Sequence, residues 1–249
     1  MEKIKILGTD VSNLSFNQTV SKIKYFIDSK RKGFVVTANP EILYRAYKDK
    51  NYQKILSQAF LITPDGVGVL WAARRKGMNI KERVTGIDLI WALAKLAESE
   101  KYRIYLLGGE PAKDGKEEIA KIAAQRLKLI HPNINIVGAT YGFLKDQGSK
   151  EKVIENIQQT KPHLLFVAFG GSSRQEKWIA KNLDKFKSPC VAIGIGGAFD
   201  MIAGKFKRAP VWMQKTGLEW LYRVIQEPSR ISRLRNVLKF LFISFFTRD

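Results

Sequence analysis

The acidic residue best placed to take part in a reaction is Asp65, in the turn Thr63-Pro64-Asp65-Gly66. An apolar run over residues 59–62 precedes this turn and a stretch of helical composition from Val67 to Arg75 follows it, so Asp65 is predicted where a strand becomes a helix. Open α/β sheets bind ligands at such junctions, so the Asp65 carboxylate is placed to meet a ligand. The alternative is that Asp65 only caps the helix or closes the turn, and these residues alone leave both interpretations open.

A second junction of the same kind carries Thr37 and Asn39. The β-branched strand over residues 34–37 ends in Thr37-Ala38-Asn39-Pro40-Glu41, where Asn39 is expected to cap a helix that begins at Pro40. Capping accounts fully for Asn39 but less well for Thr37. Both side chains are therefore candidates for contact with a ligand.

Strands, glycine-bearing turns and helices alternate along most of the chain, which predicts a mainly parallel, Rossmann-like α/β sheet covered by helices. The carboxyl ends of parallel strands share one edge, where ligands bind. Five residues are expected to line a crevice there: Thr37, Asp65, Gly108, Gln175 and Gly196. Strands are predicted at 4–7, 34–37, 59–62, 103–107 (followed by Gly108-Gly109-Glu110-Pro111), 134–137, 164–169 and 191–195. Helices are predicted at 15–27, 67–75 and 116–129, and three more are predicted to begin at residue 40, to end at residue 95 and to begin at residue 177.

The charge of the chain points to a polyanionic partner. The 249 residues include 43 Lys and Arg against 23 Asp and Glu, a formal net charge of +20. Such an excess suits nucleic acid, an anionic membrane surface or diphosphate-bearing substrates, and composition does not choose among them. Cys190 is the single cysteine, so no internal disulfide can form, and the first residues lack the apolar core of a signal peptide, which favours a cytosolic location.

Several common site motifs are missing. The nearest approach to a dinucleotide-binding glycine motif, at residues 194–199, lacks the third glycine, and there is no Walker A sequence. His131 and His163 have no neighbouring residues at metal-ligand spacing, and no Asp-x-Asp pair occurs. A nucleotide-sugar transferase without that pair must neutralise its diphosphate leaving group with Arg, Lys or helix N-termini. Nucleic-acid binding stays an alternative on charge alone, although no known DNA- or RNA-binding signature is present.

The composition shifts near Gly204, which predicts an α/β catalytic core over residues 1–204 and a helical appendage over residues 205–249. The appendage holds ten Lys and Arg residues against three Asp and Glu. Residues 218–246 alternate apolar and basic positions at helical spacing and are interrupted at Glu227-Pro228, which predicts two basic amphipathic helices. The closing apolar run over residues 237–246 is too short to span a bilayer but suits a helix lying in its interface. The alternative is that both helices pack on the core.

Together these stretches resemble the TagA/WecG/CpsF family of bacterial glycosyltransferases, glycosyltransferase family 26. The resemblance covers almost the whole chain and departs from the family at one position, where Ser173 replaces the proline of the usual Gly-x-Pro-x-Gln-Glu sequence. The motifs that carry it are Thr37-Ala38-Asn39-Pro40, Pro64-Asp65-Gly66-Val67-Gly68, the segment 82–89 (ERVTGIDL), Gln175-Glu176-Lys177-Trp178-Ile179, Gly196-Gly197-Ala198-Phe199-Asp200, Arg208-Ala209-Pro210 and the segment 218–223 (LEWLYR).

The resemblance implies an inverting enzyme that is peripheral at the cytoplasmic face of the cell membrane. It would transfer N-acetylmannosamine from UDP to the 4-hydroxyl of N-acetylglucosamine on undecaprenyl diphosphate, as in the linkage unit of wall teichoic acid. UDP-N-acetylmannosamine uronic acid or another UDP-hexose stays open as the donor. The expected partners are the UDP-sugar, the lipid diphosphate acceptor and an anionic membrane surface, with no nucleic acid, cofactor or metal.

A non-enzymatic protein of the same fold, binding lipid or nucleic acid, is the chief alternative to this enzyme. UDP release that depends on the lipid acceptor would separate the two.

The resemblance also implies roles for individual residues. The implied roles are Asp65 as the base, Thr37 and Gln175 as sugar-positioning residues, Arg83 as a lining residue of the same pocket, and Arg223, Arg230 and Arg233 as the diphosphate-binding set. Asn39, Gly108 and Gly196 are predicted as substrate-binding positions from their place at the sheet edge.

Overall fold

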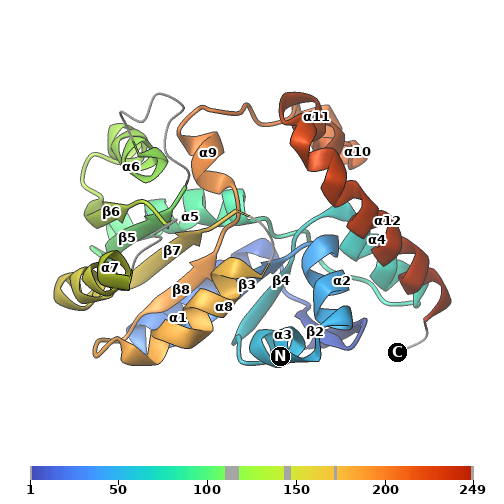
Figure 1. The fold of residues 1–249 in the computed structure, drawn as a ribbon, viewed down its shortest axis with the longest axis horizontal. Coiled ribbons are helices and arrows are strands. Elements are labelled where there is room, and N and C mark those ends of the chain that lie inside the picture. Colours follow the sequence, from blue (N-terminus) through green and yellow to red (C-terminus); the bar gives the residue numbers. More distant parts are fainter. Residues whose placement is uncertain (1, 110–117, 143–146, 171–172, 248–249) are drawn as a thin grey trace.

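The computed structural model describes residues 2–109, 118–142, 147–170 and 173–247. In this part of the chain six strands form one parallel sheet in the order β4-β3-β8-β7-β5-β6, and two further strands form a separate antiparallel hairpin (Figure 1). The predicted parallel α/β fold is thus confirmed. The sheet strands are β3 (Gly33–Ala38), β4 (Leu61–Pro64), β5 (Arg103–Gly108), β6 (Asn135–Thr140), β7 (Leu164–Ala168) and β8 (Val191–Gly194), and the hairpin strands are β1 (Lys3–Ile6) and β2 (Thr9–Ser12).

Helices bury both faces of the sheet, which explains why its central strands are apolar at nearly every position. Neighbouring residues of one strand contribute to opposite sides, as Val35 and Val36 of β3 do. One face packs against α2 (Pro40–Lys48), α3 (Lys50–Ser57), α4 (Val67–Arg75), α7 (Gln147–Thr160) and α8 (Arg174–Asn182), and the other against α1 (Phe16–Asp28), α5 (Gly86–Ser99), α6 (Ile119–Ile130) and α9 (Ala198–Ile202).

The chain leaves the adjacent strands β3 and β8 toward opposite faces of the sheet. After β3 it enters α2 on one face, and after β8 it enters α9 on the other. In open α/β sheets the usual ligand site is the crevice expected at the carboxyl ends of two strands that diverge in this way. Thr37 lies at the end of β3 and Gly196 follows β8, so the topology places both predicted residues at this crevice.

The predicted element bounds differ from the structure in a few places. The strand predicted at 59–62 is β4 at Leu61–Pro64, because its pairing with β3 continues until Pro64 lies opposite Ala38. The helix predicted from residue 177 begins at Arg174, and the one predicted from 116 is described from Ile119, residues 110–117 lying outside the described chain. No prediction was made for β2, α3, α7, α9 or α10.

The C-terminal segment forms helices that fold back onto the core. The helix break predicted at Glu227-Pro228 is confirmed, and α12 lies beside α2 and α4, with Phe240 fully buried against them (Figure 1). Among the described helices, none is long and apolar enough to cross a membrane. The segment comprises α10 (Val211–Thr216), α11 (Glu219–Gln226), the short 3-10 turn η2 (Pro228–Arg230) and α12 (Ile231–Phe246).

Candidate active site

Asp65 lies between β4 and α4 but does not cap α4. Gly66 is the N-cap residue and makes no side-chain capping bond. Asp65 Oδ2 instead accepts a hydrogen bond of 3.3 Å from the backbone N–H of Gly86, the first residue of α5. Burial raises the pKa of Asp65 to about 7, with the Gly86 bond and Arg83 opposing the rise and the negative charges of Glu219 and Asp88 adding to it. A carboxylate with a pKa near neutrality suits proton transfer at physiological pH.

Thr37 lies beside the same first turn of α5. Its buried hydroxyl donates a hydrogen bond of 2.8 Å to the carbonyl oxygen of Gly194, so it ties β3 to β8 at the crevice. A Cβ added to Gly86 would lie 3.3 Å from Thr37 Oγ1 and 3.2 Å from Cα of Ile195. Only a residue without a side chain fits between the strand ends at position 86. Gly86 thus lies next to both Asp65 and Thr37.

Gln175 supports the turn that follows β8. Its Oε1 accepts a hydrogen bond of 3.0 Å from the N–H of Gly196, and its Nε2 donates one of 2.7 Å to Glu176. Glu176 is fully buried and also accepts a hydrogen bond from the Tyr52 hydroxyl at 3.0 Å, while burial raises the pKa of its carboxyl. Gln175 is thus held in place by its hydrogen bond to Glu176. Ser173 has a φ of 80°, which the proline usual in the family at this position cannot adopt.

Two of the appendage arginines, Arg223 and Arg230, converge on the same turn. A Cβ added to Gly197 would lie 3.2 Å from an Nη2 atom of both Arg223 and Arg230. Burial and the neighbouring charge of Arg230 lower the pKa of Arg223 to about 10, and the same two causes lower the pKa of Arg233. Glu227 lies within ion-pair distance of Arg223 and Arg230. Clustered, partly buried guanidinium groups of this kind bind phosphate oxygens.

The whole sequence, beyond this arrangement of a near-neutral carboxylate and clustered arginines, shows which family the chain belongs to. Residues 4–248 match the glycosyl transferase WecG/TagA/CpsF family. The chain belongs to this family. It is 36% identical to the N-acetylglucosaminyldiphosphoundecaprenol N-acetyl-beta-D-mannosaminyltransferase of Bacillus subtilis (strain 168) over 87% of this chain and 80% of the relative. It is 34% identical to the protein of the same name from Staphylococcus aureus (strain MW2), over 96% of this chain and 91% of the relative.

The remaining predicted residues, Asn39, Arg83 and Gly108, have structural contacts of their own. Asn39 Oδ1 caps α2 by accepting a hydrogen bond of 3.0 Å from Ile42, as expected. Arg83 forms an ion pair of 3.2 Å with Glu219 of the appendage. Gly108 lies at the same sheet edge but ends β5, and a Cβ there would lie 2.2 Å from the carbonyl oxygen of Ala168, so close strand packing explains this glycine.

Several polar residues near the site have no role predicted from the sequence. Asp88, Arg208 and Glu219 form ion pairs around Arg83, and Glu176 holds Gln175. Each belongs to a stretch that carries the family resemblance, which is the signal that could have singled them out. Their contacts join residues far apart in the sequence, so spacing alone does not reveal them.

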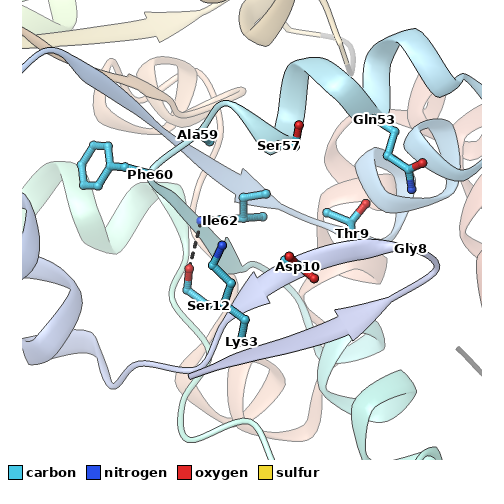
Figure 2. A pocket seen from close by; sticks show the side chains of 10 residues that line it. All are labelled: Lys3, Gly8, Thr9, Asp10, Ser12, Gln53, Ser57, Ala59, Phe60 and Ile62. Carbon is cyan, nitrogen blue, oxygen red and sulfur yellow. Dashed lines mark hydrogen bonds between the residues drawn. The ribbon is translucent and has the colours of Figure 1, made fainter. Parts of the chain in front are cut away.

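A separate hollow lies beside the β1–β2 hairpin (Figure 2). None of the candidate site residues borders it, and it adjoins the beginning of β4, whereas Asp65 follows the end of that strand. The hollow is therefore separate from the predicted site. Within the described residues, no group of three or more His, Cys, Asp or Glu side chains is arranged to hold a metal ion. The hollow is lined by Lys3, Gly8, Thr9, Asp10, Ser12, Gln53, Ser57, Ala59, Phe60 and Ile62.

Proposed function

We propose that this transferase moves N-acetylmannosamine from UDP to the 4-hydroxyl of N-acetylglucosamine on undecaprenyl diphosphate, in a single inverting displacement. The names of the Bacillus and Staphylococcus relatives support the acceptor and the sugar. The observation that carries the proposal is that Arg223 and Arg230 meet at Gly197, on the sheet edge where Asp65 lies. The product would be the linkage unit of wall teichoic acid. UDP-N-acetylmannosamine uronic acid or another UDP-hexose is the alternative donor.

In the proposed mechanism Asp65 acts as the general base. Its carboxylate removes the proton of the acceptor hydroxyl while that oxygen attacks the anomeric carbon and UDP departs from the opposite side. The pKa of about 7 makes Asp65 a stronger base than an ordinary aspartate, because burial disfavours its charged form. Thr37 and Gln175 hold the strand ends against which the sugar lies, by bonding to Gly194 and Gly196.

The arginines of the appendage stabilise the leaving diphosphate. Arg223 and Arg230 repel each other, and Arg223 Nη1 is a buried atom with no hydrogen-bond partner among the described residues. A diphosphate would supply both the missing acceptor and the missing negative charge. Arg233, whose pKa is lowered by the same neighbour, extends this cluster toward α2, where Glu41 lies close enough to favour its charge. Residues 205–249 are thus proposed to act as one unit that completes the site of the core.

The appendage is also proposed to bind the anionic cytoplasmic surface of the membrane. One face of α12 packs on the core through Phe240, while its other face exposes large apolar side chains, among which Phe242 is 67% exposed. Exposed apolar patches rimmed by cations are typical of interfacial helices. The lipid-linked acceptor lies at the headgroup level, so this face would hold the crevice at the right height. The exposed apolar residues of the appendage are Val211, Trp212, Trp220, Leu221, Ile225, Ile231, Leu238, Phe242, Phe245 and Phe246.

The test is a panel of UDP-sugars incubated with the full-length protein and a short-chain N-acetylglucosamine diphosphate lipid. We expect UDP release only when the acceptor is present, fastest with UDP-N-acetylmannosamine, and a disaccharide product with inverted anomeric configuration. Faster transfer from another UDP-hexose would reassign the donor. Absence of acceptor-dependent UDP release with every donor would contradict the transferase proposal and favour a lipid- or nucleic-acid-binding protein.

Because the arginine cluster replaces a metal in this proposal, chelation is expected to leave transfer unchanged. Initial rates measured with and without EDTA should agree within error. A rate that EDTA abolishes and Mg²⁺ or Mn²⁺ restores would show that the arginines do not stabilise the leaving group alone.

A further inference from the structure

A ladder of ion pairs joins the appendage to the core next to Asp65. Glu219 on α11 lies 3.2 Å from Nη1 of Arg83 in the core and 3.8 Å from Nε of Arg208 in the appendage. Arg208 in turn binds Asp88 on α5 through two hydrogen bonds of 2.6 and 2.9 Å. The order Arg83, Glu219, Arg208, Asp88 alternates in sign, so each group is stabilised by its neighbours.

The core end of this ladder is the turn that holds Asp65. Asp88 accepts a hydrogen bond of 2.6 Å from the Thr85 hydroxyl, and Thr85 caps α5 by accepting the N–H of Asp88. Gly86, between these two residues, donates its N–H to Asp65. Arg208 therefore anchors the very turn that supports the carboxylate.

The four charged groups of this ladder all act on Asp65. Arg83, from the segment before α5, favours the charged carboxylate, and Asp88 on α5 opposes it. From the appendage, Glu219 opposes the charged form, and the electrostatic coupling between Arg208 and Asp65 favours both charges. Two of the four groups thus come from residues beyond 204.

We propose that Glu219 and Arg208 are positioning residues for the general base, so that docking of the appendage completes the charge environment and the supporting turn of Asp65. The proposal rests on the assignment of Asp65 as the base. It gives the appendage a second task besides diphosphate binding, because an undocked appendage would leave Arg83 without Glu219 and Asp88 without Arg208. Arg83, released from Glu219, would then neutralise Asp65 and weaken it as a base.

Glu219 and Arg208 have opposite charges, so removal of each charge should shift the pKa of Asp65 in opposite directions. Removal of the negative charge in Glu219→Gln should lower the pKa of Asp65 by about half a pH unit or more, whereas Arg208→Gln should raise it by a similar amount. The pKa is measured in substrate-free, full-length protein by NMR titration of the aspartate carboxyl carbons, with the Asp65 signal assigned from its loss in Asp65→Asn. Glu219→Asp, which keeps the charge, should stay near the native value, and so should Lys215→Gln, a charge removal at an exposed position of α10.

The acid limb of the pH profile of kcat/KM should follow these titrations, moving to lower pH in Glu219→Gln and to higher pH in Arg208→Gln. Residues that merely stabilise the fold would shift the acid limb in the same direction in both variants, or in neither, and that result would overturn the proposal. The base assignment fails separately, if Asp65→Asn transfers sugar at the native rate. The NMR titrations still decide the electrostatic role of Glu219 and Arg208 in that case, because they need no turnover.

Discussion

The polar side chains of the core edge and those of the appendage are satisfied to different degrees. Thr37, Asn39 and Gln175 each bond to a backbone group of the core, at 2.8 to 3.0 Å. In the appendage, Arg223 and Arg230 lie against the same glycine, and burial together with the charge of Arg230 lowers the pKa of Arg223. The core edge is therefore preorganised before substrate arrives, whereas the arginine cluster carries excess positive charge that an anion would relieve.

The two faces of α12 differ in a comparable way. Phe240 is fully buried against α2 and α4, while Phe242, two residues later, is mostly exposed. The buried face packs the appendage onto the core, and the exposed face leaves the apolar surface that is proposed to contact the membrane. Variants in the core edge, in the arginine cluster and on the exposed face of α12 should therefore separate effects on stability from effects on substrate binding and membrane binding.

The largest effect is expected at Asp65. Asp65→Asn should lower kcat by about 10² to 10⁴ while UDP binding by calorimetry stays unchanged, since it removes the base and keeps the shape. In the native enzyme kcat/KM should rise with pH through about 7, where half of the Asp65 carboxyls have lost their proton, and level off at higher pH. A variant that turns over at the native rate would leave Asp65 with only its bond to Gly86.

Asp65 should also destabilise the folded protein at neutral pH. Its folded-state pKa of about 7 lies above the ordinary aspartate value of 3.8, so the unfolded chain releases this proton at lower pH than the folded one. The resulting penalty is absent below about pH 4, grows through the interval and is complete above 7. Asp65→Asn should therefore have a higher free energy of unfolding than the native protein at pH 8, and the difference should vanish near pH 4 in denaturant titrations.

The next largest effect is expected at Arg223. Arg223→Met keeps an apolar stem against the ring of Phe206 but removes the charge, and loss of charged hydrogen bonds worth about 1.5 to 3 kcal/mol should weaken UDP binding by about tenfold to a hundredfold. The free energy of unfolding should not fall, because the native guanidinium is buried beside Arg230. Arg235→Met, at an exposed position of α12, is the matched control for UDP binding. Equal losses in the two variants would mean that general charge, rather than this cluster, attracts UDP.

A smaller effect is expected on the exposed face of α12. Phe242→Ser should reduce binding to phosphatidylglycerol-containing liposomes by about tenfold, since a large apolar side chain contributes about 1.5 kcal/mol or more when it leaves water. Thermal stability and transfer to a water-soluble acceptor should stay native. Leu129→Ser, at an 80% exposed position of α6, removes a comparable side chain away from the appendage and should leave liposome binding intact. If both variants sediment like the native protein, the exposed face of α12 does not bind membrane.

The sequence predicts the sheet, its edge and the break in the C-terminal helices, because apolar periodicity, glycine and proline are local signals. It places Thr37 and Asp65 at neighbouring strand ends, which the parallel pairing of β3 and β4 confirms. Contacts across long sequence separations are not local. The bond from Gly196 to Gln175 and the ladder through Glu219 depend on how helices dock, and the two faces of α12 are distinguished only by what α2 and α4 cover.

The smallest effect is expected at Asn39, where capping and substrate binding can be separated. The capping bond uses Oδ1, and the Nδ2 amide is chemically able to donate to a sugar or phosphate. Asn39→Ser keeps a capping oxygen but has no amide, so it should retain the native melting temperature and raise KM for the UDP-sugar about threefold to tenfold, the value of one neutral hydrogen bond. Asn39→Ala should show the same rise in KM and lose about 1 kcal/mol of stability as well. A native KM in Asn39→Ser would assign this residue to the helix cap alone, and the core edge would then recognise substrate without it.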